Sequence, residues 1–225
     1  MVLVLFTGFL AGIVHVLSGP DHVAAVAPFS AERRSRNWII GFLWGVGHSI
    51  GVWIIGILFF LLRDALPLET LSSWSETLVG SMLIGIGLWG IHKASTQKLH
   101  YHEHNHKGVK HAHFHLHRNA GEHHHSVVHQ HSHAPLGIGL LHGLAGSSHL
   151  FGVIPALMFP AISASISYII GFGLGAIIAM SFFSWLVGRF VNKLNSQFKY
   201  GYNVIMMSFA ILSISVGVTW LYLHF

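Results

Sequence analysis

The stretch Gly12-Ile-Val-His15-Val-Leu-Ser-Gly19-Pro20-Asp21-His22 decides how the rest of the chain is interpreted. It lies in an apolar run, residues 2–28, long enough to cross a bilayer hydrocarbon core of about 30 Å. Yet it carries two imidazoles, a carboxylate and a Gly-Pro pair. A charged side chain near the bilayer centre costs about 2.5–3.5 kcal/mol on insertion scales, so it marks a functional site. Asp21 is the only acidic residue within the apolar spans predicted below.

A helix break at Gly19-Pro20 is predicted from the same stretch. On an unbroken helix His15 and His22 would share a face, whereas Asp21 would point about 120° away from them. Proline has no N–H to donate, and its ring displaces the preceding turn, so the helix opens there. The break can therefore bring Asp21 round to both histidines, and three potential ligands could converge in one small volume.

The composition indicates a membrane protein. Hydrophobic residues make up 52% of the chain and charged residues only 8%. The chain has no cysteine, which excludes disulfides and thiolate metal sites. The net charge of +5 comes from basic residues between apolar runs, a pattern explained by membrane orientation rather than by nucleic-acid binding.

The chain is predicted to be an all-α polytopic membrane protein of the plasma or inner membrane. Eleven of the twelve Lys and Arg residues fall on one face of the predicted topology, and Arg63 is the exception. The positive-inside rule makes that face cytoplasmic and places both termini outside. The six predicted spans are 2–28, 38–62, 77–94, 135–158, 162–188 and 202–224.

An internal repeat relates the two halves of the chain. Gly12, His15, Gly19, His22 and Pro28 align at a constant offset with Gly139, His142, Gly146, His149 and Pro155. Because each copy holds three spans, an odd number, the second copy must enter the membrane from the opposite side. We therefore expect a 3+3 inverted repeat in which the first helix of each repeat is interrupted. The predicted divisions are residues 1–95, 96–134 and 135–225.

The middle division is rich in histidine and lacks apolar periodicity, so we expect a disordered cytoplasmic loop. It is interpreted either as a solvated linker or as a cytoplasmic metal buffer. The candidate buffer ligands are His100, His102, His104, His106, His111, His113, His115, His117, His123, His124 and His125.

Histidines within the predicted spans are the candidate metal ligands. A single buried histidine is usually a packing residue, but two pairs at one spacing in symmetric places, with a carboxylate beside one pair, favour a metal or proton path. Nitrogen-rich sets with one carboxylate suit Ni(II) or Cu(II), and only neutral imidazole binds, so affinity should fall below about pH 6.5. The candidates are His15, Asp21, His22, His48, His142 and His149, with Ser49 and Ser148 as secondary ligands.

Three motifs resemble those of the nickel/cobalt transporter family, in particular its six-span branch similar to urease accessory protein H. They are His15-Val-Leu-Ser-Gly-Pro-Asp21-His22, Gly47-His48-Ser49 and His142-x6-His149. The resemblance implies a divalent-metal permease whose transported substrate is Ni²⁺ or Co²⁺, with no organic cofactor. It implies His15, Asp21, His22 and His48 as ligands or selectivity residues. The implied partners are the lipid bilayer, the ion, and cytoplasmic metallochaperones or urease/hydrogenase maturation proteins.

Two other functions stay open at this point. Uptake is favoured because an inside-negative potential of 100 mV is worth about 4.6 kcal/mol to a dication, but a metal/proton antiport exporter of the same ions is the alternative. From another class, paired histidines on spans could be axial ligands of a membrane bis-His haem protein. An enzyme is not expected, because the dense histidines lie in a low-complexity loop rather than in histidine boxes.

Overall fold

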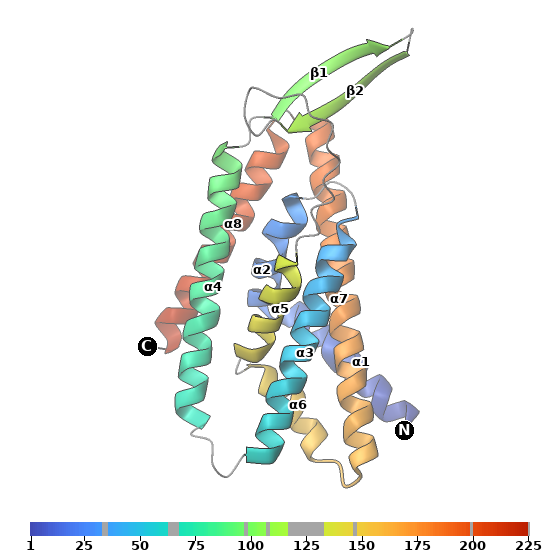
Figure 1. Ribbon diagram of the computed structural model, residues 1–225, viewed down its shortest axis with the longest axis vertical. Coiled ribbons are helices and arrows are strands. Elements are labelled where there is room, and N and C mark those ends of the chain that lie inside the picture. Colours follow the sequence, from blue (N-terminus) through green and yellow to red (C-terminus); the bar gives the residue numbers. More distant parts are fainter. Residues whose placement is uncertain are drawn as a thin grey trace.

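The computed structural model describes residues 1–32, 36–62, 68–96, 99–106, 109–116, 133–145, 148–198 and 200–224. Its elements in chain order are α1 (Val2–Ser18), α2 (Pro20–Glu32), α3 (Trp38–Leu62), α4 (Leu68–Thr96), β1 (Leu99–His106), β2 (Val109–Leu116), α5 (Ala134–Ala145), α6 (Ser148–Leu157), α7 (Ile162–Gln197) and α8 (Gly201–His224). Figure 1 shows an elongated helical bundle with the two strands projecting from one end.

In the part of the chain that the structure describes, the bundle is helical and contains four to five candidate membrane spans. Four single helices are long and apolar enough: Trp38–Leu58, Trp74–Thr96, Ile162–Gln197 and Gly201–Leu223. α1 and α2 together form a fifth candidate, bent by 74°. The remaining predicted span, 135–158, is divided into α5 of 12 residues and α6 of 10 residues. Neither half alone reaches the roughly 20 residues that a crossing requires.

The predicted break at Gly19-Pro20 is confirmed. Gly19 has an extended backbone, with φ −84° and ψ 105°, and α1 ends before it. Its N–H still donates to His15 O at 3.1 Å, while Pro20 begins α2. Proline suits a first helical position because the N–H it lacks would have no intrahelical partner there. The local sequence thus ends one helix and starts the next.

Close glycine contacts align the helices around the break. α1 packs along α7, and α5 packs along α3. A Cβ on Gly12 would collide with the carbonyl of Phe172, and a Cβ on Gly143 would collide with the carbonyl of His48. Small residues of this kind let membrane helices approach backbone to backbone. The His48 segment is therefore held directly against α5.

α2 lies at the centre of the bundle (Figure 1). It packs against α7 and α3 and also against the α4–α8 pair. Its small residues Ala24, Ala25 and Ala27 have no exposed surface. Near its end Glu32 pairs with Lys93 of α4, and the rings of Phe29 and Trp89 stack at 4.7 Å. Because α2 is short and enclosed, its first turn lies inside the protein.

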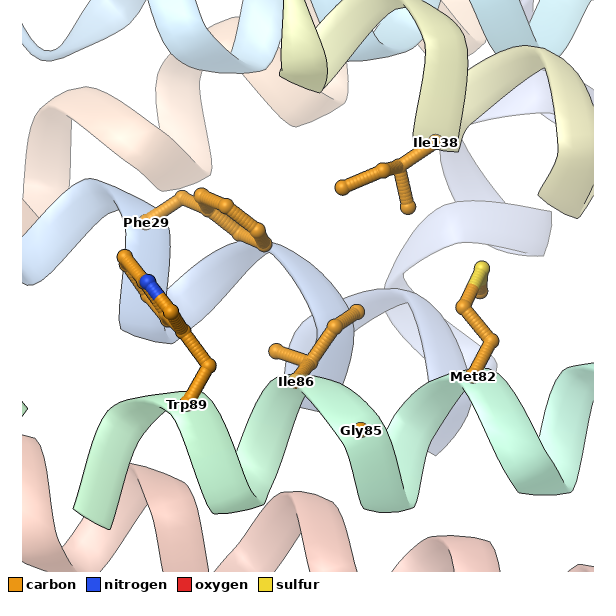
Figure 2. A pocket seen from close by; sticks show the side chains of 6 residues that line it. All are labelled: Phe29, Met82, Gly85, Ile86, Trp89 and Ile138. Carbon is orange, nitrogen blue, oxygen red and sulfur yellow. The ribbon is translucent and has the colours of Figure 1, made fainter. Parts of the chain in front are cut away.

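An apolar cavity of about 360 Å³ lies between α2, α4 and α5, whose side chains line it (Figure 2). Apart from the neighbouring backbone of α4, no described atom lies within 4 Å of a Cβ built on Gly85. The cavity offers no charged or imidazole side chain to an ion. It is lined by Phe29, Met82, Gly85, Ile86, Trp89 and Ile138.

The histidine-rich segment differs from the prediction of disorder. β1 and β2 form an antiparallel hairpin in which His100 pairs in register with His115 and His104 with His111. The physical reason is the alternating His-x-His spacing, which has the period of two that a strand requires. Residues 117–132, which include His123, His124 and His125, lie outside the described residues.

Candidate metal centre

Five of the six predicted metal ligands meet in one cluster, in which four are buried and His15 is partly exposed. His15 comes from the last turn of α1, Asp21 and His22 from the first turn of α2, His48 from α3 and His142 from α5. Asp21 is 2% exposed, His22 1%, and His48 and His142 are fully buried. Four helices from both halves of the chain therefore converge on a nitrogen-rich volume containing one carboxylate.

The cluster divides into two overlapping groups of ligands. His15, His22 and His48 form one group, and Asp21, His22 and His142 form the other. In each group, one ligand atom from every residue lies within 4.8 Å of the others. Imidazoles that bind a metal at about 2.0–2.1 Å stand roughly 3.4 Å apart in a tetrahedral shell. Small side-chain movements would thus complete either group around an ion.

Asp21 connects histidines from the two halves of the chain. Its Oδ1 lies 3.0 Å from His22 Nδ1, and its Oδ2 lies 3.2 Å from His142 Nε2. An ionised carboxylate only accepts hydrogen bonds, so His22 Nδ1 donates to Asp21, while His142 Nε2 lies beside the second carboxylate oxygen. The positive end of α2 also favours the charge of Asp21 in its first turn. A carboxylate that holds imidazoles in this way sets their orientation and leaves their other nitrogens for a metal.

Gly19 is required by the close approach of its neighbours. A Cβ at this position would collide with His22 Nδ1 and lie 2.8 Å from Asp21 Oδ1. Because its φ is negative, the constraint is one of space rather than of backbone conformation. The predicted helix break thus also makes room for the Asp21–His22 contact.

The remaining predicted residues have other positions. Ser49 is buried, but its hydroxyl donates to Gly173 O at 3.2 Å and so ties α3 to α7 instead of joining either group. His149 and Ser148 belong to α6, and their side chains lie outside the described part of the structure.

A second buried acid, Glu76, corrects the prediction that Asp21 is the only one. The predicted third span began at residue 77, but α4 begins at Leu68, so Glu76 lies inside the helix and is 3% exposed. It accepts a hydrogen bond from Trp220 Nε1. The polar residues before the apolar run concealed the length of α4, and the contact with α8 has no signal in the sequence.

The described imidazoles around His22 are packed too closely to flank a haem. The imidazole rings pack directly on one another, with centroids separated by 4.6 Å for His15–His22, 5.0 Å for His22–His48 and 4.7 Å for His22–His142. A bis-His haem requires a flat macrocycle between its two axial rings. Rings in mutual contact fit a single ion instead.

Comparison with known proteins supports the conclusion that this chain is a membrane protein. Residues 3–212 match the family described as cytochrome c biogenesis protein transmembrane region. The chain belongs to this family. The region matched to the cytochrome c biogenesis transmembrane family includes every described residue of the cluster.

Three curated relatives are also similar to this chain. Chloroplast proteins FOR GROWTH AND FERTILITY 2 and 1 of Arabidopsis thaliana are 36% identical over 186 residues and 37% identical over 196 residues, each covering 81% of this chain. The chain spans about half of their length, 46% and 49% respectively. Urease accessory protein UreH of Bacillus sp. (strain TB-90) is 29% identical over 202 residues, which cover 82% of this chain and 76% of UreH. No solved structure matches.

Proposed function

We propose that this protein is a permease for divalent transition-metal ions, with Ni²⁺ or Co²⁺ as the transported substrate. The observation that carries the proposal is the buried cluster of four imidazoles and one carboxylate where helices from both halves meet. Imidazole ligands favour late first-row metals, whereas Mg²⁺ and Ca²⁺ prefer oxygen. A site with this donor set inside a membrane bundle suits the passage of such an ion.

The composition of the chain and the lining of its apolar cavity argue against two other functions, a thiol–disulfide relay and an ion path through that cavity. A thiol–disulfide relay requires cysteine, and these 225 residues contain none. The apolar cavity beside Gly85 has no ligand for an ion, so it is not assigned to the path.

The proposed transport unit is a six-span 3+3 inverted repeat. Two features support it: α1–α2 and α5–α6 are both pairs of short helices, and the packing of α1 on α7 is repeated by α5 on α3. Discontinuous helices at a repeat interface are the usual setting of a transporter substrate site. On this proposal the cluster lies at that interface.

Uptake into the cytoplasm is the proposed direction. The ends of α4 and α7 lie at the hairpin end of the bundle (Figure 1), and they carry Lys93, Arg189 and Lys193. The positive-inside rule favours that end as cytoplasmic, with both termini outside. The hairpin would then buffer arriving ions. The proposed recipients are cytoplasmic metallochaperones or urease/hydrogenase maturation proteins, and the similarity to urease accessory protein UreH supports the urease part of that proposal.

Metal/proton antiport is the second candidate, because Glu76 supplies a buried carboxylate besides Asp21. Ion flux into proteoliposomes separates the two directions. We expect Ni²⁺ and Co²⁺, but not Mg²⁺, to enter faster as the potential becomes more inside-negative, without a pH gradient. Dependence on an opposing proton gradient would reverse the assignment to antiport. Absence of flux for every transition metal would contradict both. Protein-free liposomes are the control.

A further inference from the structure

His22 is the one residue that belongs to both ligand groups. Its ring lies against those of His15, His48 and His142, with centroid distances of 4.6 Å, 5.0 Å and 4.7 Å. Its Nδ1 donates to Asp21, so only Nε2 keeps a lone pair for a metal. An imidazole whose Nδ1 carries the proton donated to Asp21 cannot bridge two ions.

The two groups also differ in charge and in origin. The first group is made only of imidazoles, from α1, α2 and α3, all within the first half of the chain. The second contains the carboxylate of Asp21 and takes His142 from α5 in the second half. A relative movement of the halves would therefore change the second group and leave the first intact.

We propose that the transported ion occupies two overlapping positions in turn, one at His15–His22–His48 and one at Asp21–His22–His142, and that His22 holds it throughout. The inference rests on the proposed function, which names the ion. In passing from the first position to the second, the ion loses its bonds to His15 and His48 and gains bonds to Asp21 and His142. Each ligand keeps its own electron pair, and the His22 ring turns with the ion.

This arrangement has a physical advantage for transport. An ion held by all five residues at once would be bound too tightly to leave. Conduction requires binding that is strong enough for the ion to enter, but weak enough or spread over enough positions for it to be released. Exchange of two bonds at a time, with one bond retained, meets both conditions. The carboxylate makes the second position the stronger one.

The test is Co²⁺ binding to the purified full-length chain, followed by visible absorption, which depends on the number and type of ligands. All proteins in the series carry serine at the fourteen histidines between residues 100 and 133, so that the loop does not bind the probe. The variants are His48→Gln, His142→Gln, the double variant and His22→Gln. His92→Gln, at an exposed position of α4, is the matched control.

Two alternative positions make a quantitative prediction. The total association constant is the sum of those of the two positions, so deleting the weaker one costs at most about twofold in affinity. We expect one Co²⁺ per chain, a loss of no more than about twofold in His48→Gln, and a larger loss with a changed spectrum in His142→Gln. His22→Gln and the double variant should both lose Co²⁺ binding, whereas His92→Gln should not change.

Other outcomes would overturn the inference. A single five-residue centre would make His48→Gln as damaging as His22→Gln, and two bound Co²⁺ ions per chain would show that the positions are not exclusive. Thermal unfolding of each variant without metal separates ligand loss from misfolding. A change in Co²⁺ binding is attributed to ligand loss when the variant unfolds at the same temperature as His92→Gln. If His48→Gln unfolds at a lower temperature, His15→Gln, which removes another ligand of the same position, is measured in its place. Flux tests the function separately, because a chain that binds as predicted but transports nothing refutes only the proposed function.

Discussion

Substitution of Asp21 by Asn changes the charge of the cluster while keeping its shape. The carboxylate now accepts from His22 Nδ1 at 3.0 Å and faces His142 Nε2 at 3.2 Å. An amide has only one acceptor oxygen, so in one of its two orientations its NH₂ group would face the His22 Nδ1–H group instead. Leaving one buried donor without an acceptor costs about 1–3 kcal/mol of stability.

The effect on the ion is expected to be larger. An ion in the second group lies within about 4.8 Å of the carboxylate oxygen, because its ligand atoms lie within 4.8 Å of one another. A dication and a unit negative charge at that distance attract by about 7 kcal/mol at an effective dielectric constant of 20. Dehydration of the carboxylate offsets part of this attraction. If only 2.7 kcal/mol remains, the Kd still rises by about a hundredfold.

The assay is Co²⁺ titration of the purified protein, together with Ni²⁺ flux in proteoliposomes. We expect Asp21→Asn to weaken Co²⁺ binding by about a hundredfold or more and to abolish flux, while the protein remains folded in the membrane. Glu32→Gln is the matched control, since it removes a carboxylate of the same helix that pairs with Lys93 outside the cluster. Normal flux and affinity in well-expressed Asp21→Asn would refute the assignment of Asp21 to the site.

Three further predictions follow from the same geometry. Gly19→Ala should weaken Co²⁺ binding by about tenfold or more by displacing His22 from Asp21, whereas Gly137→Ala, where a Cβ meets no atom within 4 Å, should leave the titration unchanged. Replacement of Thr96–His133 by a Gly/Ser linker of similar length should preserve Ni²⁺ flux but reduce the number of ions bound per chain, and loss of flux would make the segment part of the path. Gly85→Leu, which fills the apolar cavity, should raise thermal stability by about 0.5–1 kcal/mol through helix propensity without changing Co²⁺ affinity. A lower Co²⁺ affinity in Gly85→Leu would connect that cavity to the ion site.

The sequence alone determined the features that depend on neighbouring residues. Apolar runs identify the membrane class because burial in lipid depends on local hydropathy. The break at Gly19-Pro20 could be predicted because proline ends a helix through its own missing N–H. The identities of the candidate ligands were also predictable, since ionisable residues such as histidine and aspartate are costly to place in a membrane and mark functional sites there.

Only the tertiary structure decided which of these ligands meet. The repeat relates His142 to His15 by symmetry, but not to Asp21, and the contact between His142 and Asp21 exists because glycines let α5 approach α3 beside α2. The division of the cluster at His22 and the engagement of Ser49 with α7 likewise depend on helix rotation and spacing. Those quantities are set by side-chain contacts between segments far apart in the chain, and hydropathy along one segment carries no information about them.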